Sequence, residues 1–568
     1  MGRKTSAAAA AARPSSWILS PGSDLLLFVG TPILILPAVL LLDGSWGTEA
    51  LYLFVASFGA LGHHLPGMMR AYGDKALFQR FKARFLFAPI FLLATCIPLA
   101  FHQKSVLILV VYFWGMWHGF MQMHGFARIY DAKWKSFAPR TVALDRAVGL
   151  FGFAGALVFS DPRINMLLDN WYRAGGPLVQ PELIGTMRWI FGGVFTAVLL
   201  AYVVNAWQCQ RRGAPQSPVK HLLLATTIGF FWVANVVIAS PLLAVVLFEI
   251  FHDVQYLTIV WLFNRKRAQA ADVGAFTKFL FRRSTGLVAL YVGLVFAYGG
   301  FNLLQELVLK PPVHTIMAGV LAASGLLHFY YDGFIWKVKE KSTREALGLE
   351  GGVDAGGPKN RLPAWSLHGL RWAVFVVPVL AFAVAAAPQA REEDELVLAL
   401  AESLPESAEV QRNRAIALYQ RDELDDAIVA GRRAAELFED PQKRNKARAD
   451  LAAMLYQSAL DELASFDREQ AGELLREAAA LRPTLADEAH AEGLSLAKQS
   501  GQVGEATRRF EAAVLLDPSH VDARLDLAIS AARAKRYDLA QEHAEEAARL
   551  APNDPRPADL LQRLARVR

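Results

Sequence analysis

Long runs of apolar residues alternate with short polar segments over the first 389 residues of the chain. A bilayer core about 30 Å thick is crossed by about 20 apolar residues in a helix, and most of these runs come close to that length. The pattern therefore predicts an all-α protein whose membrane part has about eleven spans. They are expected at 25–42, 49–71, 85–101, 105–127, 144–160, 187–207, 221–240, 242–263, 284–304, 314–336 and 372–389.

Lys and Arg gather after every second apolar run, while the alternate loops carry few of them. The positive-inside rule then places the N-terminus in the cytoplasm and makes every even-numbered span run toward it. Since the span count is odd, the C-terminal part is expected outside the cytoplasm. We expect a multi-pass protein of a bacterial inner membrane.

The chain divides into five predicted parts. Residues 1–16 form a short cytoplasmic tail and 17–344 a membrane domain. Residues 345–371 are rich in Gly and Pro and predict a loop. A last span at 372–389 leads to a helical domain at 390–568, which is rich in Ala, Leu, Glu and Arg.

An internal repeat marks the C-terminal domain. Four residues, Ala506, Ala513, Leu516 and Pro518, recur 34 positions later as Ala540, Ala547, Leu550 and Pro552. Earlier copies contain Ala471, Ala478 and Pro483, and then Ala415, Ala427 and Ala434.

Residues 408–554 resemble the tetratricopeptide repeat in both period and residue type. The resemblance implies paired helices that bind a protein or peptide partner on a concave face. The chain departs from the pattern at Glu439, which replaces the usual proline, and at Leu494, which replaces a small residue. An insertion of about ten residues precedes the second copy.

Composition and charge support two different domains. The chain is 54% apolar, and residues 390–568 contain 25 Lys and Arg against 35 Asp and Glu. This net charge of −10 leaves +16 for residues 1–389, since the total is +6. The basic residues adjoin predicted spans, so topology explains them and we expect no nucleic-acid partner.

Histidines inside four apolar runs give the main indication of chemistry. His63, His118, His252 and His328 lie about 11 to 15 residues into their spans, a spread in depth of about 6 Å. Ionisable groups at bilayer depth are costly and are usually functional. Imidazoles that meet at one depth favour a transition-metal site.

Carboxylates near these histidines strengthen the metal hypothesis. Glu249 precedes His252 by three residues and Asp332 follows His328 by four, so each pair shares a helix face. A mixture of histidine and carboxylate favours non-haem iron over structural zinc. The predicted metal ligands, with carboxylates as ligands or as groups that orient them, are His63, His64, His118, Glu249, His252, Asp253, His328 and Asp332.

The alternative is that each histidine hydrogen-bonds between helices or lines a water-filled cavity. His124 lies six residues after His118, faces elsewhere and is expected beside the site or at the membrane boundary. Arg70, Arg128 and Lys337, at the cytoplasmic ends of spans, are expected to be topology anchors or to hold an anionic headgroup or cofactor at the mouth of the site.

The membrane domain also resembles integral-membrane histidine-motif oxygenases, such as the fatty acid hydroxylase and desaturase group and the bacterial carotene dioxygenases. The chain has one His-His pair and isolated histidines in place of the clustered motifs of the hydroxylases. The resemblance therefore implies only a metal held by histidines of several spans.

Three functions follow as hypotheses. The first is a metal-dependent oxygenase, hydroxylase or desaturase that acts on a lipid-like substrate, with a repeat domain that binds a protein partner. The second is a non-catalytic scaffold or transporter whose repeats recruit an envelope partner. The third is a haem protein with two of these histidines as ligands.

Overall fold

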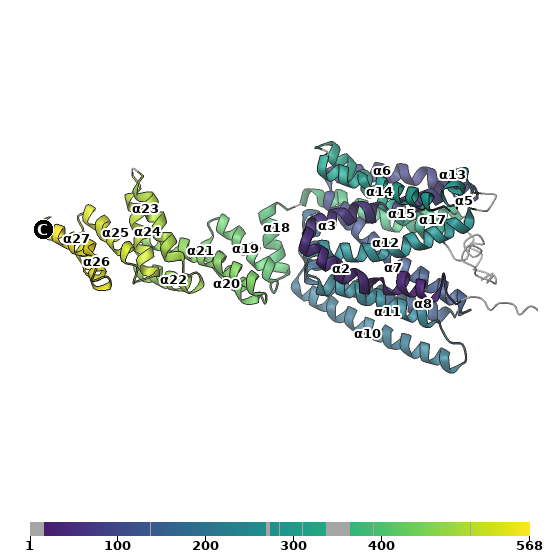
Figure 1. Ribbon diagram of the computed structural model, residues 1–568, viewed down its shortest axis with the longest axis horizontal. Helices are drawn as coiled ribbons and strands as arrows, with labels where there is room; N and C mark the ends of the chain where they lie inside the picture. The colour runs from purple at the N-terminus through teal and green to yellow at the C-terminus, as the bar shows by residue number, and fades with distance from the viewer. Residues whose placement is uncertain are drawn as a thin grey trace, which may run out of the picture. The chain divides into compact units, whose positions relative to one another are not determined.

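A computed structural model of the protein describes residues 16–136, 138–268, 273–282, 284–308, 310–336, 364–389, 391–499 and 501–567. The chain divides into two compact units, with the boundary between Arg391 and Glu392. The second unit begins two residues after the predicted start of the C-terminal domain at 390. Both units are built from helices (Figure 1).

The first unit is a bundle of long helices with short helices at their ends. Their bounds are α1 Pro21–Asp24, η1 Leu25–Gly30, α2 Thr31–Trp46, α3 Thr48–Phe54, η2 Val55–Leu61, α4 His64–Gly73, α5 Lys75–Arg80, α6 Lys82–His102, α7 Lys104–Lys133, α8 Pro139–Val158, α9 Asp161–Arg173, α10 Pro181–Arg211, α11 Pro218–Trp232, η3 Val233–Val237, α12 Pro241–Arg267, α13 Ala275–Leu280, α14 Thr285–Val308, α15 Val313–Ile335, α17 Ala364–Ala386 and η4 Ala387–Gln389.

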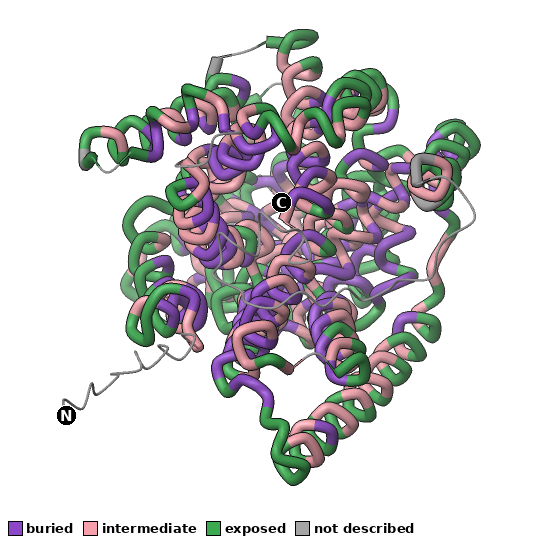
Figure 2. Tube along the Cα trace, turned by 90° about the vertical axis from the view of Figure 1, so that its right-hand side faces the viewer, coloured by how far each residue is buried: buried purple, intermediate pink, exposed green. Residues whose placement is uncertain are grey.

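Among the described residues, ten helices are long and apolar enough to cross a membrane, judged by length and composition. They correspond to ten of the eleven predicted spans. Buried residues gather on the inner sides of the helices and exposed residues on the outer turns (Figure 2).

The predicted span 49–71 is the exception, because it is not one continuous helix. It consists of α3, the wide turns of η2, and α4, which begins only at His64. A Cβ on Gly62 would lie 2.3 Å from the Phe58 carbonyl oxygen, so only glycine fits this close approach. Irregular backbone of this kind is tolerated at bilayer depth where it is buried in protein. The break places His63 at the junction.

The last predicted span begins earlier than expected. We predicted a loop through residue 371, but α17 is helical from Ala364, and residues 345–363 lie outside the described part. Because polar residues occur near the start of α17, the apolar pattern did not indicate that the helix begins before residue 372. Tyr330 Oη and His368 Nε2 lie 2.8 Å apart, and the rings of Trp372 and Trp114 have centroids 4.8 Å apart. Helix α17 therefore packs against other helices of the first unit.

The second unit is a series of antiparallel helix pairs. Their bounds are α18 Glu393–Ser403, α19 Ala408–Gln420, α20 Leu424–Leu437, α21 Pro441–Ser465, α22 Arg468–Leu481, α23 Leu485–Ala497, α24 Val503–Leu516, α25 Val521–Arg533, α26 Tyr537–Leu550 and α27 Pro555–Val567. The alanines of the repeat are buried between paired helices. The predicted insertion lengthens α21 to 25 residues instead of forming a loop.

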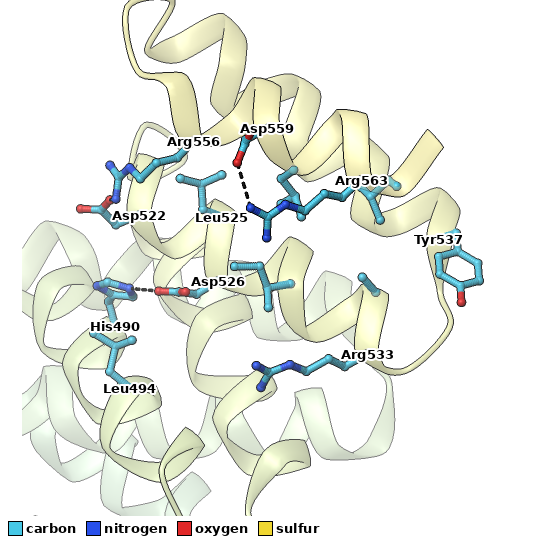
Figure 3. Close-up of a pocket in the computed structure, with 14 residues that line it drawn as sticks. His490, Leu494, Asp522, Leu525, Asp526, Arg533, Tyr537, Arg556, Asp559 and Arg563 are labelled. Carbon is cyan, nitrogen blue, oxygen red and sulfur yellow. Dashed lines mark hydrogen bonds and ion pairs between the residues drawn. The ribbon is translucent and has the colours of Figure 1, made fainter. Parts of the chain in front are cut away.

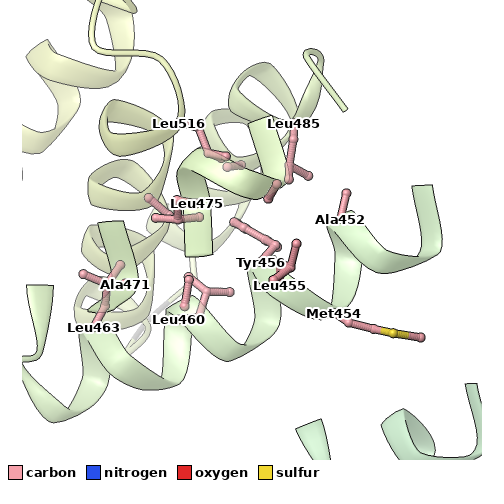
Figure 4. Packing of buried hydrophobic residues seen from close by; sticks show 14 of the residues in the cluster. Ala452, Met454, Leu455, Tyr456, Leu460, Leu463, Ala471, Leu475, Leu485 and Leu516 are labelled. Atoms are coloured by element: carbon pink, nitrogen blue, oxygen red, sulfur yellow. The ribbon is translucent and has the colours of Figure 1, made fainter. Parts of the chain in front are cut away.

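Apolar residues of α21 to α24 meet in one cluster, which Figure 4 shows. Leu455, Leu475, Leu485 and Leu516 belong to it, each from a different helix. The cluster extends from α19 to α25, and a second cluster joins α25, α26 and α27, because each helix pair buries its apolar face on its neighbours.

The turn inside each helix pair requires a left-handed backbone. The residues at this point are Asp422, Phe466, Gly501 and Lys535, with φ between 62° and 85°. This conformation costs about 1 to 2 kcal/mol for a residue other than glycine. Phe466 is also 87% exposed, so its ring contributes little packing.

We expect the substitution Phe466→Gly to raise the stability of the second unit by about 1 kcal/mol, because glycine adopts this conformation without strain. Gly501→Ala should shift stability in the opposite direction. Calorimetry of the purified full chain measures both effects. A lower melting temperature for Phe466→Gly would show that the exposed ring stabilises the fold.

Candidate metal site

Four buried histidines meet in the middle of the first unit. His63 comes from the break between η2 and α4, His118 from α7, His252 from α12 and His328 from α15. One donor nitrogen from each lies within 4.8 Å of the others. The matched depth inferred from the sequence agrees with this convergence.

The spacing of the imidazoles resembles that of ligands around one ion. His63 Nε2 and His328 Nε2 are 3.1 Å apart, and the ring centroids of His118 and His328 are 4.7 Å apart. Metal–nitrogen bonds of about 2.0 to 2.1 Å separate adjacent ligands by about 3.0 to 3.4 Å and opposite ones by about 4.2 Å. His118 Nε2 is buried and has no hydrogen-bond partner among the described residues, as a metal-directed nitrogen would.

Asp332 adds a carboxylate to this group. Its Oδ2 atom is 3.7 Å from His328 Nε2 and 4.0 Å from His118 Nε2. Its other oxygen accepts hydrogen bonds from Tyr256 Oη at 3.2 Å and Trp336 Nε1 at 2.9 Å. One oxygen is thereby held in place while the other faces the histidines.

Asp253 and Glu249 lie on the other side of His63. Asp253 Oδ1 is 2.7 Å from His63 Nδ1, and Glu249 joins these two residues in a second group of possible ligands. A carboxylate that accepts the remaining N–H of a ligating histidine fixes its tautomer and ring orientation. His63 Nδ1 also lies 3.2 Å from the Gly59 carbonyl oxygen, so the backbone of η2 and the Asp253 carboxylate together hold this side of the ring.

Two of the remaining histidines lie outside the convergent group. His64 stacks on His328 with ring centroids 4.7 Å apart, and its Nδ1 is 3.3 Å from Ser324 Oγ. His124 is buried in α7 but is not among the grouped donors. The helix break explains why adjacent His63 and His64 have different surroundings.

Two of the basic residues expected at the mouth of the site, Arg70 and Arg128, have other surroundings in the structure. Arg70 was expected as a surface anchor but is buried, with its guanidinium 3.8 Å from the Phe263 ring centre and 3.9 Å from that of Trp336. Cation–π contacts of this kind stabilise a desolvated cation. Lys337 lies outside the described residues.

Arg128 takes part in a buried ion network that joins α7, α8 and α11. It pairs with Asp131 at 2.7 Å and with Asp145, and Lys220 pairs with the same two acids at 3.2 and 3.1 Å. Two cations and two anions are thus matched.

Comparison with known proteins concerns the second unit. Residues 497–564 match a family model described as tetratricopeptide repeat. The C-terminal unit contains tetratricopeptide repeats. A solved structure titled "Crystal structure of YrrB: a TPR protein with an unusual peptide-binding site" is 16% identical and covers 35% of this chain and 97% of its own, with a TM-score of 0.16. No curated protein matches the chain.

The match confirms the tetratricopeptide resemblance and supports a protein-interaction role for the tetratricopeptide domain. It lies wholly within the second unit. The resemblance of the first unit to membrane histidine-motif oxygenases stays a prediction, as does its location in a membrane.

Three further residues of the site, Tyr256, Trp336 and Gly67, were not predicted from the sequence. Tyr256 follows His252 by four residues and Trp336 follows Asp332 by four, so helix spacing would have placed each beside a candidate ligand. Nothing in the sequence indicated Gly67, because its role depends on contacts between helices.

Gly67 of α4 packs directly against the polar groups of the site. A Cβ at this position would lie 2.7 Å from Tyr256 Oη and 3.4 Å from His328 Nδ1. We expect Gly67→Ala to displace Tyr256 and weaken its hydrogen bond to Asp332, lowering metal affinity about tenfold, as changes next to ligands do. Gly333→Ala is the matched control, since its Cβ would meet nothing within 4 Å. Metal titration of both variants measures the difference, and equal affinities would contradict the assigned position of Tyr256.

Proposed function

We propose that the protein is an integral membrane oxidoreductase that holds a transition metal, with iron as the best fit, between His63, His118, His252 and His328. The observation that carries this proposal is the convergence of four buried imidazoles from separate segments of the bundle. Burial of this many imidazoles without a shared ligand would leave polar groups poorly satisfied. The tetratricopeptide domain would bind a protein partner.

Surface composition supports the membrane location. Helix α10 exposes apolar residues along its length and has Trp189 86% exposed and Trp207 58% exposed. These tryptophans are 18 residues apart, or about 27 Å along a helix, close to the thickness of a bilayer core. Tryptophans are enriched at both membrane–water interfaces.

The donor set supports iron. Four imidazoles and the carboxylate of Asp332 are nitrogen and oxygen ligands of the kind non-haem iron uses. When bound, iron would supply the activation of dioxygen. The protein's part is to exclude water with packed helices, to orient His63 through Asp253 and to hold Asp332 through Tyr256 and Trp336.

A lipid-like substrate is consistent with the depth of the site. His118, His252 and His328 each lie 11 to 15 residues from the first residue of their helices. If these helices span a bilayer, the site lies in its interior, and an apolar molecule reaches it without entering water. Phe329 stacks on His118 with ring centroids 4.7 Å apart and gives one side of the site an apolar face.

The haem hypothesis fits this geometry less well. A porphyrin fills four coordination positions in one plane and leaves two for histidine, whereas here four donor nitrogens lie within 4.8 Å of one another. The scaffold or transporter hypothesis requires no metal at all. Elemental analysis and the absorbance spectrum of detergent-purified protein therefore distinguish the three, and protein without metal would contradict the oxidoreductase proposal.

The proposed topology predicts where reporter enzymes become active. Alkaline phosphatase fused after Arg568 should be active, because it folds only outside the cytoplasm, while fusion after Lys341 should be inactive. Expression of both fusions must be equal. An inactive C-terminal fusion would mean that α17 does not cross the membrane and would place the repeats in the cytoplasm.

A further inference from the structure

Arg163 is a buried cation that lacks a counter-ion among the described residues. It is the third residue of α9, and only 2% of its surface is exposed. Its donors meet only neutral oxygens: Nε donates to Asn235 Oδ1 at 2.9 Å, and Nη2 donates to the carbonyl oxygens of Ala234 and Ser240 at 3.4 Å. The remaining nitrogen, Nη1, is buried and has no hydrogen-bond partner in the described part of the chain. A buried charge without an opposite charge beside it is costly.

Other charged side chains of the protein show how such a cost is usually avoided. Lys220, which is also buried, pairs with both Asp131 and Asp145. In the second unit, Arg563 pairs with Asp559 in the lining of the cavity that Figure 3 shows. Since no described carboxylate does the same for Arg163, an anion from outside the chain would balance its charge.

Two helix N-termini add positive potential at the same place. Helix α9 begins directly after Ser160, and α12 begins after Ser240, whose carbonyl oxygen accepts the bond from Arg163. A helix N-terminus carries about half an elementary positive charge. The acid in the first turn of α9, Asp161, is 65% exposed and pairs with Arg188, so it does not compensate Arg163.

Apolar side chains lie on the outside of this end of the bundle. Residues 238–240 form an irregular segment between η3 and α12, and Arg163 donates to residues on both sides of it. Val237, next to this segment, is 71% exposed, and Phe159, next to the start of α9, is 37% exposed. The proposed topology puts these residues at the extracytoplasmic boundary of the membrane, where charged headgroups and apolar chains meet.

We propose that Arg163 and the N-termini of α9 and α12 bind the oxyanion of an acidic amphiphile, a carboxylate or phosphate attached to an apolar chain. A guanidinium binds such oxyanions through parallel N–H donors, and Nη1 has donors to offer. The apolar surroundings favour an amphiphile over a free anion. The inference goes beyond the proposed oxidoreductase, because it uses the proposed membrane location but none of the grouped metal ligands.

The test compares oleate with oleyl alcohol, which has the same chain without the charge. Full-length protein is purified in a neutral detergent, freed of lipid and kept in alkaline buffer, in which the carboxylate is ionised. We expect oleate to bind about tenfold more tightly, because hydrogen bonds between charged groups are stronger than neutral ones. Native mass spectrometry counts the bound molecules. Inorganic phosphate, the second probe, should compete only weakly, because it has no chain.

Variants assign the preference to this residue. Arg163→Gln should bind oleate no more tightly than oleyl alcohol. Arg173→Gln removes a partly exposed arginine farther along α9 and should keep the preference. The two variants change the net charge equally, so a general attraction of anions to the basic first unit affects both alike. Arg163→Lys should retain part of the preference, since lysine keeps the charge and loses the planar pair of donors.

A photoreactive fatty acid tests the position on the wild-type protein, so the test does not depend on the folding of a variant. With a diazirine beside its carboxylate, it should label α9 or residues 233–241, and excess oleate should suppress the labelling. Labelling confined to other segments, or an unchanged preference in Arg163→Gln, would overturn the proposal. Inorganic phosphate that displaces the fatty acid as well as oleate does would also overturn it, because the site would then take a free anion.

The outcome is separable from the fate of the other proposals. Chelator-treated protein should bind oleate as untreated protein does, since Arg163 is not among the grouped metal ligands. The reporter fusions test the membrane location independently.

Discussion

Replacing His118 with alanine should remove most of the bound metal and the activity together. The same result is expected for His252→Ala and His328→Ala, because each imidazole contributes one of the four convergent donors. Substitutions of residues next to metal ligands already cost about 10- to 100-fold in affinity or activity, so loss of a ligand should cost at least that. Metal content per protein, measured by elemental analysis, is the readout.

His124→Ala provides the matched control, since His124 lies in the same helix as His118 and is also buried, yet is not among the grouped donors. His314→Ala is a second control, because His314 lies about 21 Å along α15 from His328. Expression and melting temperature must accompany each measurement, because a buried hydrogen-bonding histidine also stabilises the fold. Stable variants that retain wild-type metal would favour the scaffold or transporter hypothesis.

The helical period and the depth of the histidines within their apolar runs explain why much of the candidate site could be predicted from the sequence. Helix spacing puts Asp332 on the same face as His328, and the apolar runs place their histidines at similar depth. These relations depend on single helices, which the sequence specifies. The same is true of the repeats, whose alanines recur with a fixed period and are buried between helices.

Contacts between helices could not be predicted in this way. Nothing in the apolar pattern distinguishes His63 from His64, because the break before α4 depends on how Gly62 packs against Phe58 and Val295. The partnership of His63 with Asp253 joins two segments 190 residues apart and needs the tertiary fold. Arg70 was misjudged for a similar reason: a basic residue at a span end usually anchors it, yet here Phe263 and Trp336 enclose the side chain.

Lys220 is a further basic residue whose burial could not be predicted, since it follows the predicted span 187–207 and directly precedes the next one. Its side chain is fully buried, at 0% exposure, and lies 3.2 Å from Asp131 and 3.1 Å from Asp145. Gln216 Oε1 accepts a further hydrogen bond from its ammonium group at 2.6 Å. The cation therefore fixes α11 to both α7 and α8.

Lys220→Met should destabilise the protein by about 3 to 5 kcal/mol, because removal of one partner leaves buried charge uncompensated. Two carboxylates would then share the single cation of Arg128, and one must take up a proton or water must enter. The double variant Lys220→Met with Asp145→Asn removes one charge of each sign and should recover part of the loss. Thermal unfolding in detergent measures each change.

The ion pair between Arg188 and Asp161 is partly exposed and serves as a control for the effect of burial on stability. Arg188→Met should cost less than about 1 kcal/mol, because solvent screens that pair. If Lys220→Met melts at the wild-type temperature, or if the double variant is less stable than the single one, the network does not hold α7, α8 and α11 together.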